Sequence, residues 1–300
     1  QGGHDLDAPI LIRTVYLDEG RLRVPVGATL VRHSDPLGEV SETHGKAAGV
    51  LGAIGAIERD HAAESVDDDA PAPRRSLAED PEIGALLASR NERLADFWMN
   101  PQGEDRSGPF AGRTAVVVDA EDRFTTMLGH QLGHLGLDVR IVPWEQVQDA
   151  DIDAADLVVA GPGPGDPRDQ TSPRIARMRD VVARRRASAA PLLAVCLSHQ
   201  ILADSLNIEL VPLEAPHQGV QKTVPVFEED ASVGFYNTFT ARVAPGTTHV
   251  DVAEVSADAV SGDVYALRGE HFASVQGHLE SILSRDGIRT LERLAAHALA

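Results

Sequence analysis

The sequence predicts an α/β protein built on an open, mostly parallel sheet with helices on both faces. From residue 113 onward, short apolar runs alternate with segments of helical spacing, as in a parallel sheet with crossover helices. A loop rich in glycine and proline, residues 161–167, follows one of these runs, and the single cysteine, Cys196, ends another. Ligands of open α/β sheets bind at the carboxyl ends of the strands, so both features fall where a site is expected.

The first 58 residues indicate a small α+β piece. Residues 11–17 and 22–31 alternate apolar and polar side chains and predict two strands joined at Glu19–Gly20. Residues 39–57 have helical spacing. Because two strands and one helix are too few to fold independently, we expect residues 1–58 to be the remnant of a larger domain. The sequence does not begin with methionine, so we expect the chain to be a fragment of a longer protein.

Residues 59–110 predict a linker that carries one helix. Residues 58–76 contain Asp, Ala, Pro and Arg with few large apolar side chains, a composition that does not bury a core. A single helix is expected over 80–100, because Pro81 suits a first turn and apolar side chains from Ile83 to Phe97 recur at helical spacing.

Residues 111–300 carry the predicted sheet. Buried strands are expected at 114–119, 139–143, 157–160 and 192–195, and helices at 124–135 and 175–185. Later runs predict added strands at 223–227, 240–243, 250–255, 264–267 and 272–275, followed by a closing helix at 287–299. A length of 300 residues suggests about two domains.

The composition excludes several classes of function. A net charge of −19 repels phosphate backbones, so no nucleic-acid partner is expected. No apolar run is long enough to cross a bilayer, so no membrane partner is expected either. One cysteine excludes an internal disulfide and fits a reducing, cytoplasmic location. The run Arg184-Arg185-Arg186 predicts an exposed helix end.

Cys196 is the first candidate for chemistry. An apolar strand ends at this thiol and a helix-like segment begins directly after it, which predicts the strand–turn–helix geometry of a nucleophile elbow. A helix amino terminus and a nearby imidazole both favour the reactive thiolate. A buried structural cysteine is the alternative, and the polar Ser198-His199-Gln200 that follows argues against it.

Two pairs of polar residues are further candidates. His278 and Glu280 would share one face of a strand, and with Cys196 they predict acyl transfer through a thioester. His130 and His134 have the spacing of a metal-binding helix, but they lack a third ligand, which favours a solvated helix face.

The glycine loop at 161–167 is a further candidate. Its glycines let the main chain approach a ligand and point N–H groups at it. It is not a phosphate-binding P-loop, because no Gly-Lys-Ser/Thr follows. A plain turn is the alternative interpretation.

With these motifs together, the segment from about residue 113 to 299 resembles the class I glutamine amidotransferases of the triad type, in the anthranilate synthase branch. The resemblance implies a flavodoxin-like fold in which Cys196 is the nucleophile and His278 and Glu280 complete the triad. The residues that it implies for the oxyanion hole and the glutamine site are Gly163, Pro164, Gly165, Leu197, Gln200, His217, Gly219, Thr238 and Phe239.

The predicted elbow departs from the family's Gly-x-Cys-x-Gly-x-Gln pattern. Ala194 and Ser198 stand where the family has glycines, which permit a tight, strained turn, so we expect altered packing at the elbow. The form Cys-Leu-Ser-His-Gln, from Cys196 to Gln200, is similar to that of fused synthases of phenazine pathways, which make 2-amino-2-deoxyisochorismate.

Residues 8–57 resemble the carboxyl end of a chorismate-utilising domain. The resemblance implies that Arg13 grips a chorismate carboxylate, that Gly27-Ala28-Thr29 forms a backbone site and that Glu42 is a magnesium ligand. Magnesium is the implied cofactor of the chorismate domain, and the glutaminase half needs none. The rest of that domain is expected to be missing, so this chain alone would not aminate chorismate.

The resemblance implies a glutaminase that supplies ammonia to chorismate, in a longer protein that forms a homodimer. One alternative is anthranilate synthase, which uses the same half and then eliminates pyruvate. A second is a cysteine hydrolase of the same fold with another γ-glutamyl substrate, against which the chorismate-like segment argues. A third is a non-catalytic regulatory domain, against which the intact set of Cys196, His278 and Glu280 argues.

Overall fold

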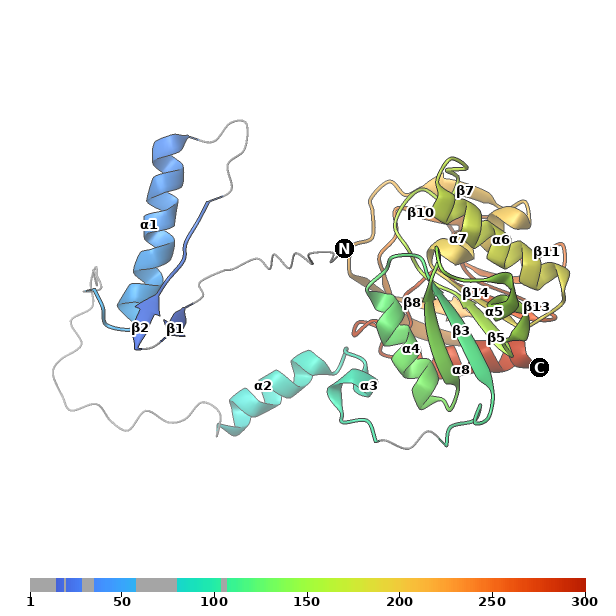
Figure 1. Ribbon diagram of the computed structural model, residues 1–300, viewed down its shortest axis with the longest axis horizontal. Helices are drawn as coiled ribbons and strands as arrows, with labels where there is room; N and C mark the ends of the chain where they lie inside the picture. The colour runs from blue at the N-terminus through green and yellow to red at the C-terminus, as the bar shows by residue number, and fades with distance from the viewer. Residues whose placement is uncertain (1–14, 19, 29–34, 58–79, 104–106) are drawn as a thin grey trace. The chain divides into compact units, whose positions relative to one another are not determined.

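The computed structural model describes residues 15–18, 20–28, 35–57, 80–103 and 107–300 (Figure 1). The chain divides into two compact units, residues 1–74 and 75–300. This division falls inside the segment 59–110 that the sequence predicts as a linker. Within the described ranges, no helix combines the length and the apolar character that crossing a bilayer requires.

The first unit contains a hairpin and one helix. Strands β1 (Tyr16–Asp18) and β2 (Arg21–Arg23) pair antiparallel, and Gly20 takes the left-handed conformation that their tight turn requires. Helix α1 (Pro36–Ala53) begins three residues before its predicted start, because Asp35 caps it by accepting a bond from the Gly38 N–H at 2.7 Å. No residue of α1 is buried. Residues 24–28 of the second predicted strand are not strand, and residues 11–14 and 29–31 lie outside the described ranges.

The helix predicted over 80–100 is two helices, so that prediction was wrong. Helix α2 (Pro81–Asn91) starts at its proline with Asp80 as cap, and α3 is a single turn (Asp96–Met99). The break at 92–95 has a tertiary cause. The Ala95 N–H leaves the helical path and donates to the carbonyl of Ile282, far along the chain, at 2.8 Å. Helical spacing in the sequence does not reveal such a contact.

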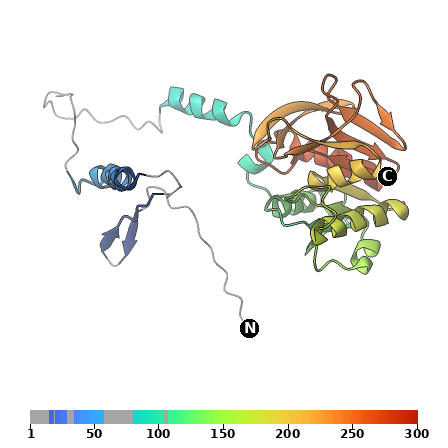
Figure 2. The ribbon, with the colours of Figure 1, turned by 90° about the horizontal axis from the view of Figure 1, so that it is seen from above.

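The second unit is built on one eight-stranded sheet, and the predicted fold class is confirmed (Figures 1 and 2). Neighbouring strands in the sheet are β11 (His249–Val250), β12 (Ala253–Ala257), β13 (Val264–Gly269), β14 (Phe272–Val275), β6 (Leu192–Val195), β5 (Leu157–Ala160), β3 (Thr114–Asp119) and β4 (Asp138–Pro143). The strands from β14 to β4 pair parallel, and β11 to β13 are added antiparallel.

Helices cover both faces of this sheet. Alternate side chains of one strand point to opposite faces, so Val117 packs with α4 (Phe124–His134) and α8 (Gly287–Leu299). Val116 and Val118 pack instead with α5 (Asp149–Ala154), α6 (Pro173–Ala187) and α7 (Leu197–Ser205). The apolar side chains on each face form a separate core. The two cores together hold the carboxyl ends of the strands in place.

Four smaller elements differ from the sequence prediction. Strand β7 (Glu209–Pro212) pairs with β10 (Phe239–Arg242), and β8 (Val220–Val226) pairs with β9 (Glu229–Phe235). Strands β7 and β9 and helix α5 had no prediction, and each begins with acidic side chains that shorten its apolar pattern. The single strand predicted over 250–255 is instead β11 and β12, which are separated by a turn with Asp251 at φ +50°.

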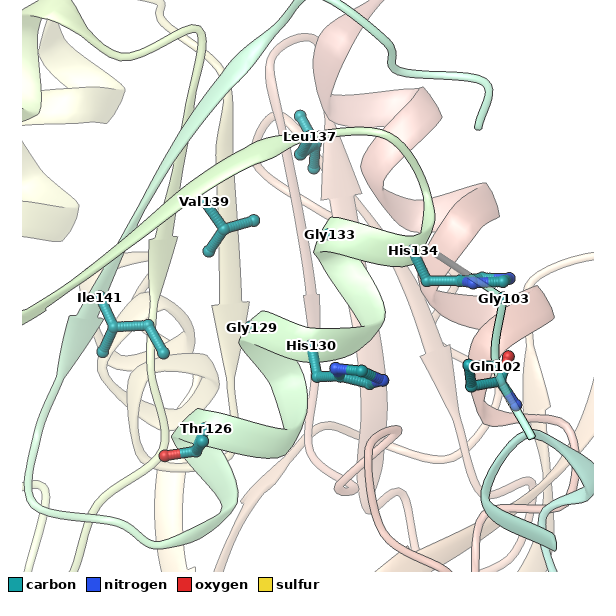
Figure 3. A pocket seen from close by; sticks show the side chains of 10 residues that line it. All are labelled: Gln102, Gly103, Thr126, Gly129, His130, Gly133, His134, Leu137, Val139 and Ile141. Atoms are coloured by element: carbon teal, nitrogen blue, oxygen red, sulfur yellow. The ribbon is translucent and has the colours of Figure 1, made fainter. Parts of the chain in front are cut away.

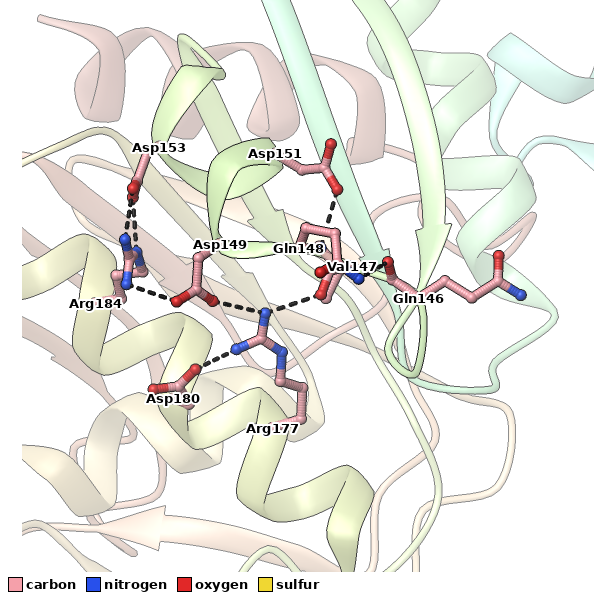
Figure 4. Close-up of polar contacts among 9 residues, drawn as sticks. All are labelled: Gln146, Val147, Gln148, Asp149, Asp151, Asp153, Arg177, Asp180 and Arg184. Atoms are coloured by element: carbon pink, nitrogen blue, oxygen red, sulfur yellow. Dashed lines mark hydrogen bonds and ion pairs between the residues drawn. The ribbon is translucent and has the colours of Figure 1, made fainter.

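Ion pairs tie α5 to α6 on the surface (Figure 4). Arg184 contacts both Asp149 and Asp153, and Arg177 contacts Asp149 and Asp180. Since these groups are partly exposed and screened by solvent, each pair contributes little to the free energy of folding on its own.

Arg185 is buried, so the prediction that the arginine run is an exposed helix end was wrong for this residue. Its side chain is 2% exposed, and its guanidinium donates to the carbonyls of Ile152, Ala155 and Pro191 at 2.7–3.2 Å. These carbonyls lie at the end of α5 and before β5 and β6. The planar guanidinium therefore supplies donors to buried carbonyls at the ends of these elements, and the Pro191 carbonyl also accepts from the Val158 N–H at 3.1 Å.

We predict that Arg185→Ala lowers the free energy of unfolding by about 2–4 kcal/mol, because the buried carbonyls of Ile152 and Ala155 lose the donor that Arg185 supplies. The matched control is the neighbouring Arg184→Ala, which removes only exposed ion pairs and costs less than about 1 kcal/mol. Urea unfolding followed by tryptophan fluorescence measures both. Equal losses in the two variants would contradict the buried role of Arg185.

Candidate active site

Cys196 lies in a sharp turn between β6 and α7. Its backbone has φ 52° and ψ −102°, a conformation that costs a non-glycine residue free energy and is typical of functional sites. The Cys196 N–H donates to the carbonyl of Val275 at 2.9 Å, and its own carbonyl accepts from the Gln200 N–H at 3.1 Å. The side chain is 6% exposed. The predicted strand–turn–helix geometry is confirmed.

His278 and Glu280 lie beside this elbow. Strands β14 and β6 pair parallel with Val275 opposite Val195, so the chain leaves β14 next to Cys196. The two residues lie in a turn after β14 and not on a strand, so the predicted route to their contact was wrong. The turn still brings His278 Nδ1 within 2.7 Å of Glu280 Oε1. Both side chains are at most 1% exposed.

The charges around His278 favour the imidazolium. Burial opposes the charged ring, but the charges of Cys196 and Glu280 and hydrogen bonds to both raise the pKa of His278 well above its usual value. The thiol and the carboxylate are thus the two groups that raise the pKa of the imidazole. This arrangement can hold a thiolate–imidazolium pair with Glu280 orienting the ring.

The surroundings of the imidazole keep it in place. The rings of Phe124 and Tyr236 lie 4.7 and 5.2 Å from the His278 ring, measured between centroids. The Tyr236 hydroxyl hydrogen-bonds to Ser281 Oγ at 2.9 Å, and the Ser284 hydroxyl donates to the His278 carbonyl. The sequence prediction missed Phe124 and Tyr236, because each comes from an element remote in the sequence and neither belongs to a recognisable motif.

The glycine loop packs directly on the elbow. A Cβ atom at Gly163 would lie 2.5 Å from the Ala120 carbonyl oxygen and 3.0 Å from Leu197 Cδ2, so only glycine fits there. The Ser198 hydroxyl donates to the Gly161 carbonyl at 2.8 Å. Ser198, which stands where the family has a glycine, therefore links the elbow to the loop.

The far side of the loop is held by two arginines. Arg174 donates to the Pro164 carbonyl at 2.9 Å, beside Gly165 at φ +110°. Arg168 pairs with Asp166 at 2.8 Å, and its guanidinium lies 4.6 Å from the centre of the Phe239 ring. This contact joins the loop to the segment that the resemblance assigns to glutamine binding.

Gln200 lies within a short chain of side-chain amides that ends at the sulfur. Its Nε2 donates to the Phe239 carbonyl at 2.7 Å and to Gln276 Oε1 at 2.9 Å. Gln276 Nε2 in turn donates to Cys196 Sγ at 3.7 Å. The sequence prediction missed Gln276. The sequence does contain a pattern that could have indicated this residue, because Gln276 is polar, directly follows a buried strand and stands two positions before His278.

His217, Gly219 and Thr238 form a neighbouring edge. The His217 N–H donates to the Asn237 carbonyl at 2.9 Å, and the Gly219 N–H donates to the Phe235 carbonyl at 3.1 Å. Thr238 is exposed, and its carbonyl accepts from the Leu213 N–H. Burial, followed by the charge of Lys222, lowers the pKa of His217, so its imidazole is neutral near pH 7. The backbone hydrogen bonds of this edge place residues 213–219 alongside residues 235–238.

The residues assigned to chorismate and magnesium lie in the first unit. Lys46 pairs with Glu42 at 2.5 Å and donates to the Gly27 carbonyl at 3.0 Å, and Ala28 follows in the same loop. Arg13 and Thr29 lie outside the described residues. Among the described residues, no group of three or more His, Cys, Asp or Glu side chains could hold a metal. Glu42 alone does not make a magnesium site.

His130 and His134 project from α4 toward Gln102 and Gly103 (Figure 3), and the predicted solvated face was wrong for His134, which is half-buried. They line a cavity of about 660 Å³ together with Gln102 and Gly103. The His130 ring stacks on Trp98 at 5.6 Å, and the His134 ring meets Phe97 edge-on at 5.1 Å. The pair therefore packs against α3, which explains its spacing without a metal.

Two family models match the chain. Residues 116–298 match the model of the class-I glutamine amidotransferases, and residues 1–52 match that of chorismate binding enzymes. The chain is 41% identical to "Anthranilate synthase, phenazine specific" of Pseudomonas fluorescens and 40% identical to that of Pseudomonas chlororaphis, over 100% of this chain and 45% of each relative. It thus spans about half the length of these relatives.

The fold has a solved counterpart. A putative GMP synthase subunit from Thermoplasma acidophilum aligns with a TM-score of 0.50 and 19% identity, covering 61% of this chain and 94% of that one. At this identity the likeness supports the fold alone. Because the family model matches more than half of the chain, the protein belongs to the class-I glutamine amidotransferase family.

Proposed function

We propose that this chain hydrolyses L-glutamine at Cys196 and that, in a longer enzyme, it supplies the ammonia to a chorismate site. The observation that carries the proposal is a buried imidazole, hydrogen-bonded to a carboxylate, on the turn that leaves β14 beside the thiol. His278 Nδ1 is bonded to Glu280, and the charge of Cys196 helps to raise the pKa of the ring, at an elbow packed against a glycine loop. A nucleophile, a base and an orienting carboxylate in this order are the requirements of acyl transfer.

The chemistry follows from the positions of these groups. His278 takes the proton of the thiol, and the sulfur attacks the side-chain amide carbon of glutamine. The N–H groups of Leu197 and of the loop from Gly163 to Gly165 stabilise the oxyanion. His278 then gives its proton to the leaving ammonia, which leaves a γ-glutamyl thioester. Water, deprotonated by His278, hydrolyses the thioester to glutamate and regenerates the thiol.

The proposed glutamine site lies along the edge beside the elbow. Gln200 is suited to the α-ammonium of the substrate, because its amide oxygen is an acceptor and its position is fixed by bonds to the Phe239 carbonyl and Gln276. We assign the main chain of Thr238 and Phe239 to the substrate's α-carboxylate. His217 and Gly219 would border the bound amino acid from the neighbouring loop.

For the second half of the reaction, we propose amination of chorismate to 2-amino-2-deoxyisochorismate. Support comes from the match of residues 1–52 to chorismate binding enzymes and from the names of the phenazine-specific relatives. Arg13 and the loop Gly27-Ala28-Thr29 would contact chorismate. Glu42 would be one magnesium ligand, with the others supplied by residues beyond this chain. We further propose a cytoplasmic homodimer of the longer protein.

Anthranilate is the second candidate product, because the same relatives carry the name anthranilate synthase. Both reactions begin with the same ammonia, so the glutaminase residues do not distinguish them. Incubation of the longer enzyme with chorismate, glutamine and Mg²⁺, followed by mass spectrometry of the products, does. Aminodeoxyisochorismate with little pyruvate supports our proposal, and stoichiometric pyruvate with anthranilate contradicts it.

We predict that Cys196→Ser lowers glutamine-dependent synthesis by the longer enzyme at least about 10³-fold, because the hydroxyl is a far weaker nucleophile at neutral pH. Synthesis from added ammonium salts, which bypasses the thiol, should remain within about twofold. Unchanged glutamine turnover would refute the thioester route, and loss of both activities would point to misfolding.

We also predict that His278→Gln slows alkylation of Cys196 by iodoacetamide at pH 7 by about tenfold, because the variant lacks the imidazolium that favours the reactive thiolate. Because the pKa of His278 is raised, the imidazolium is fully formed below its ordinary value and is lost as pH rises through the higher folded value. Cys196 is the chain's only thiol, so adduct mass reads this site directly. The exposed His249→Gln is the control, and equal rates in all three proteins would exclude the ion pair.

A further inference from the structure

A short segment ahead of the sheet contacts the backbone of the proposed triad. We call residues 93–99, which include α3, the α3 strap. Trp98 Nε1 donates to the Glu280 carbonyl at 2.7 Å, and the Ala95 N–H donates to the Ile282 carbonyl at 2.8 Å. Gln221 Nε2 donates to the carbonyls of both Arg93 and Leu283 at 2.6 Å. The strap is therefore bonded along the turn that carries Glu280.

The other side of the strap is anchored on α4. Phe97 is 8% exposed, and its ring lies 5.1 Å from that of His134 and 5.8 Å from that of His130. The Trp98 ring stacks on His130 at 5.6 Å with a 29° interplanar angle. Figure 3 shows both imidazoles on the same side of α4. The indole is thus held by stacking on one side, so its N–H is aimed at one carbonyl.

The position of the Glu280 carboxylate depends on its backbone. Oε1 contacts His278, but Oε2 is buried and has no hydrogen-bond partner. With only one bond to orient it, the carboxylate is placed mainly by the peptide units on either side of Cα. Trp98 fixes one of these units by holding the Glu280 carbonyl. Loss of that bond lets the carboxylate turn away from the imidazole.

The strap lies outside the part of the chain that matches the amidotransferase family. The matched residues begin at 116, whereas the strap ends at 99. We infer that Trp98 is a positioning residue for Glu280, so that the segment before the sheet is a working part of the glutaminase site. This inference rests on the proposed glutaminase function. The indole N–H fixes the position of the Glu280 backbone. Glu280 in turn sets the charge and orientation of His278.

Trp98→Phe in the longer enzyme tests the inference, because it keeps a stacking ring and removes only the donor. The kcat for glutamine hydrolysis should fall about tenfold, because one hydrogen bond that supports the site is lost. The KM for glutamine should stay within about twofold of that of the unchanged enzyme. The alkaline limb of the kcat–pH profile should move to lower pH, because His278 loses part of the carboxylate interaction that raises its pKa. Ammonia-dependent synthesis should not change.

Two comparisons separate positioning from general stability. Met99→Ala alters an exposed side chain of the same strap and should leave kcat and the pH profile unchanged. In a Glu280→Gln background, Trp98→Phe should cost no further loss of kcat, because its effect passes through that carboxylate. Losses that multiply in the double variant would overturn the inference, as would an unchanged kcat and pH profile in Trp98→Phe.

The outcomes also separate this inference from the proposed function. If Cys196→Ser abolishes glutamine turnover and Trp98→Phe does not alter it, the glutaminase proposal stands and the role of Trp98 falls. If Cys196→Ser retains glutamine turnover, the proposed function itself falls. Should Trp98→Phe prove too unstable to assay, Gln221→Leu, which removes the link between Arg93 of the strap and Leu283 of the turn, should produce the same shift of the pH profile.

Discussion

The parallel pairing of β14 with β6 is the constraint on which the site depends. Val275 lies opposite Val195, and its carbonyl accepts from the Cys196 N–H. This register fixes where the chain leaves β14 relative to the sulfur. Gln276 and His278 follow within three residues, so both reach the elbow without a long loop. A register change by one residue would turn the side chains of β14 to the opposite faces and separate the imidazole from the thiol.

Two buried imidazoles near this register show how the surroundings set the charge. His199 is fully buried with Ser274 as its side-chain partner, and burial lowers its pKa to about 4. His278 is buried as well, but the charges of Cys196 and Glu280 raise its pKa. The difference is the presence of charged partners and not the depth of burial. Only His278 is therefore suited to exchange a proton with a sulfur near neutral pH.

The sequence predicts well what depends on local pattern. The apolar runs of β3, β5, β6 and β14 and the amphipathic α8 are found with the predicted boundaries, because buried strands and one-sided helices leave a clear periodicity. The elbow is also predictable from the sequence, because an apolar run ends at the thiol and a helical segment begins directly after it.

What depends on distant contacts was missed. The break between α2 and α3 arises from the bond of Ala95 to Ile282, and Arg185 is buried because carbonyls from other elements surround it. Phe124, Tyr236 and Gln276 join the site through tertiary packing. Charged side chains hid β9, whose edge position tolerates Glu229 and Asp230. Except for β9, which pairs with the adjacent β8, the deciding partner in each case lies far away in the sequence.

The central claim is that the sulfur of Cys196 forms a covalent bond to the γ-carbonyl of glutamine. Acid quenching of the longer enzyme during turnover, followed by mass spectrometry of its peptides, measures this bond directly. The account predicts a γ-glutamyl adduct on the peptide that contains Cys196, which appears with glutamine and disappears when glutamine is exhausted. Rapid glutamine hydrolysis with no adduct on that peptide at any quench time would contradict it.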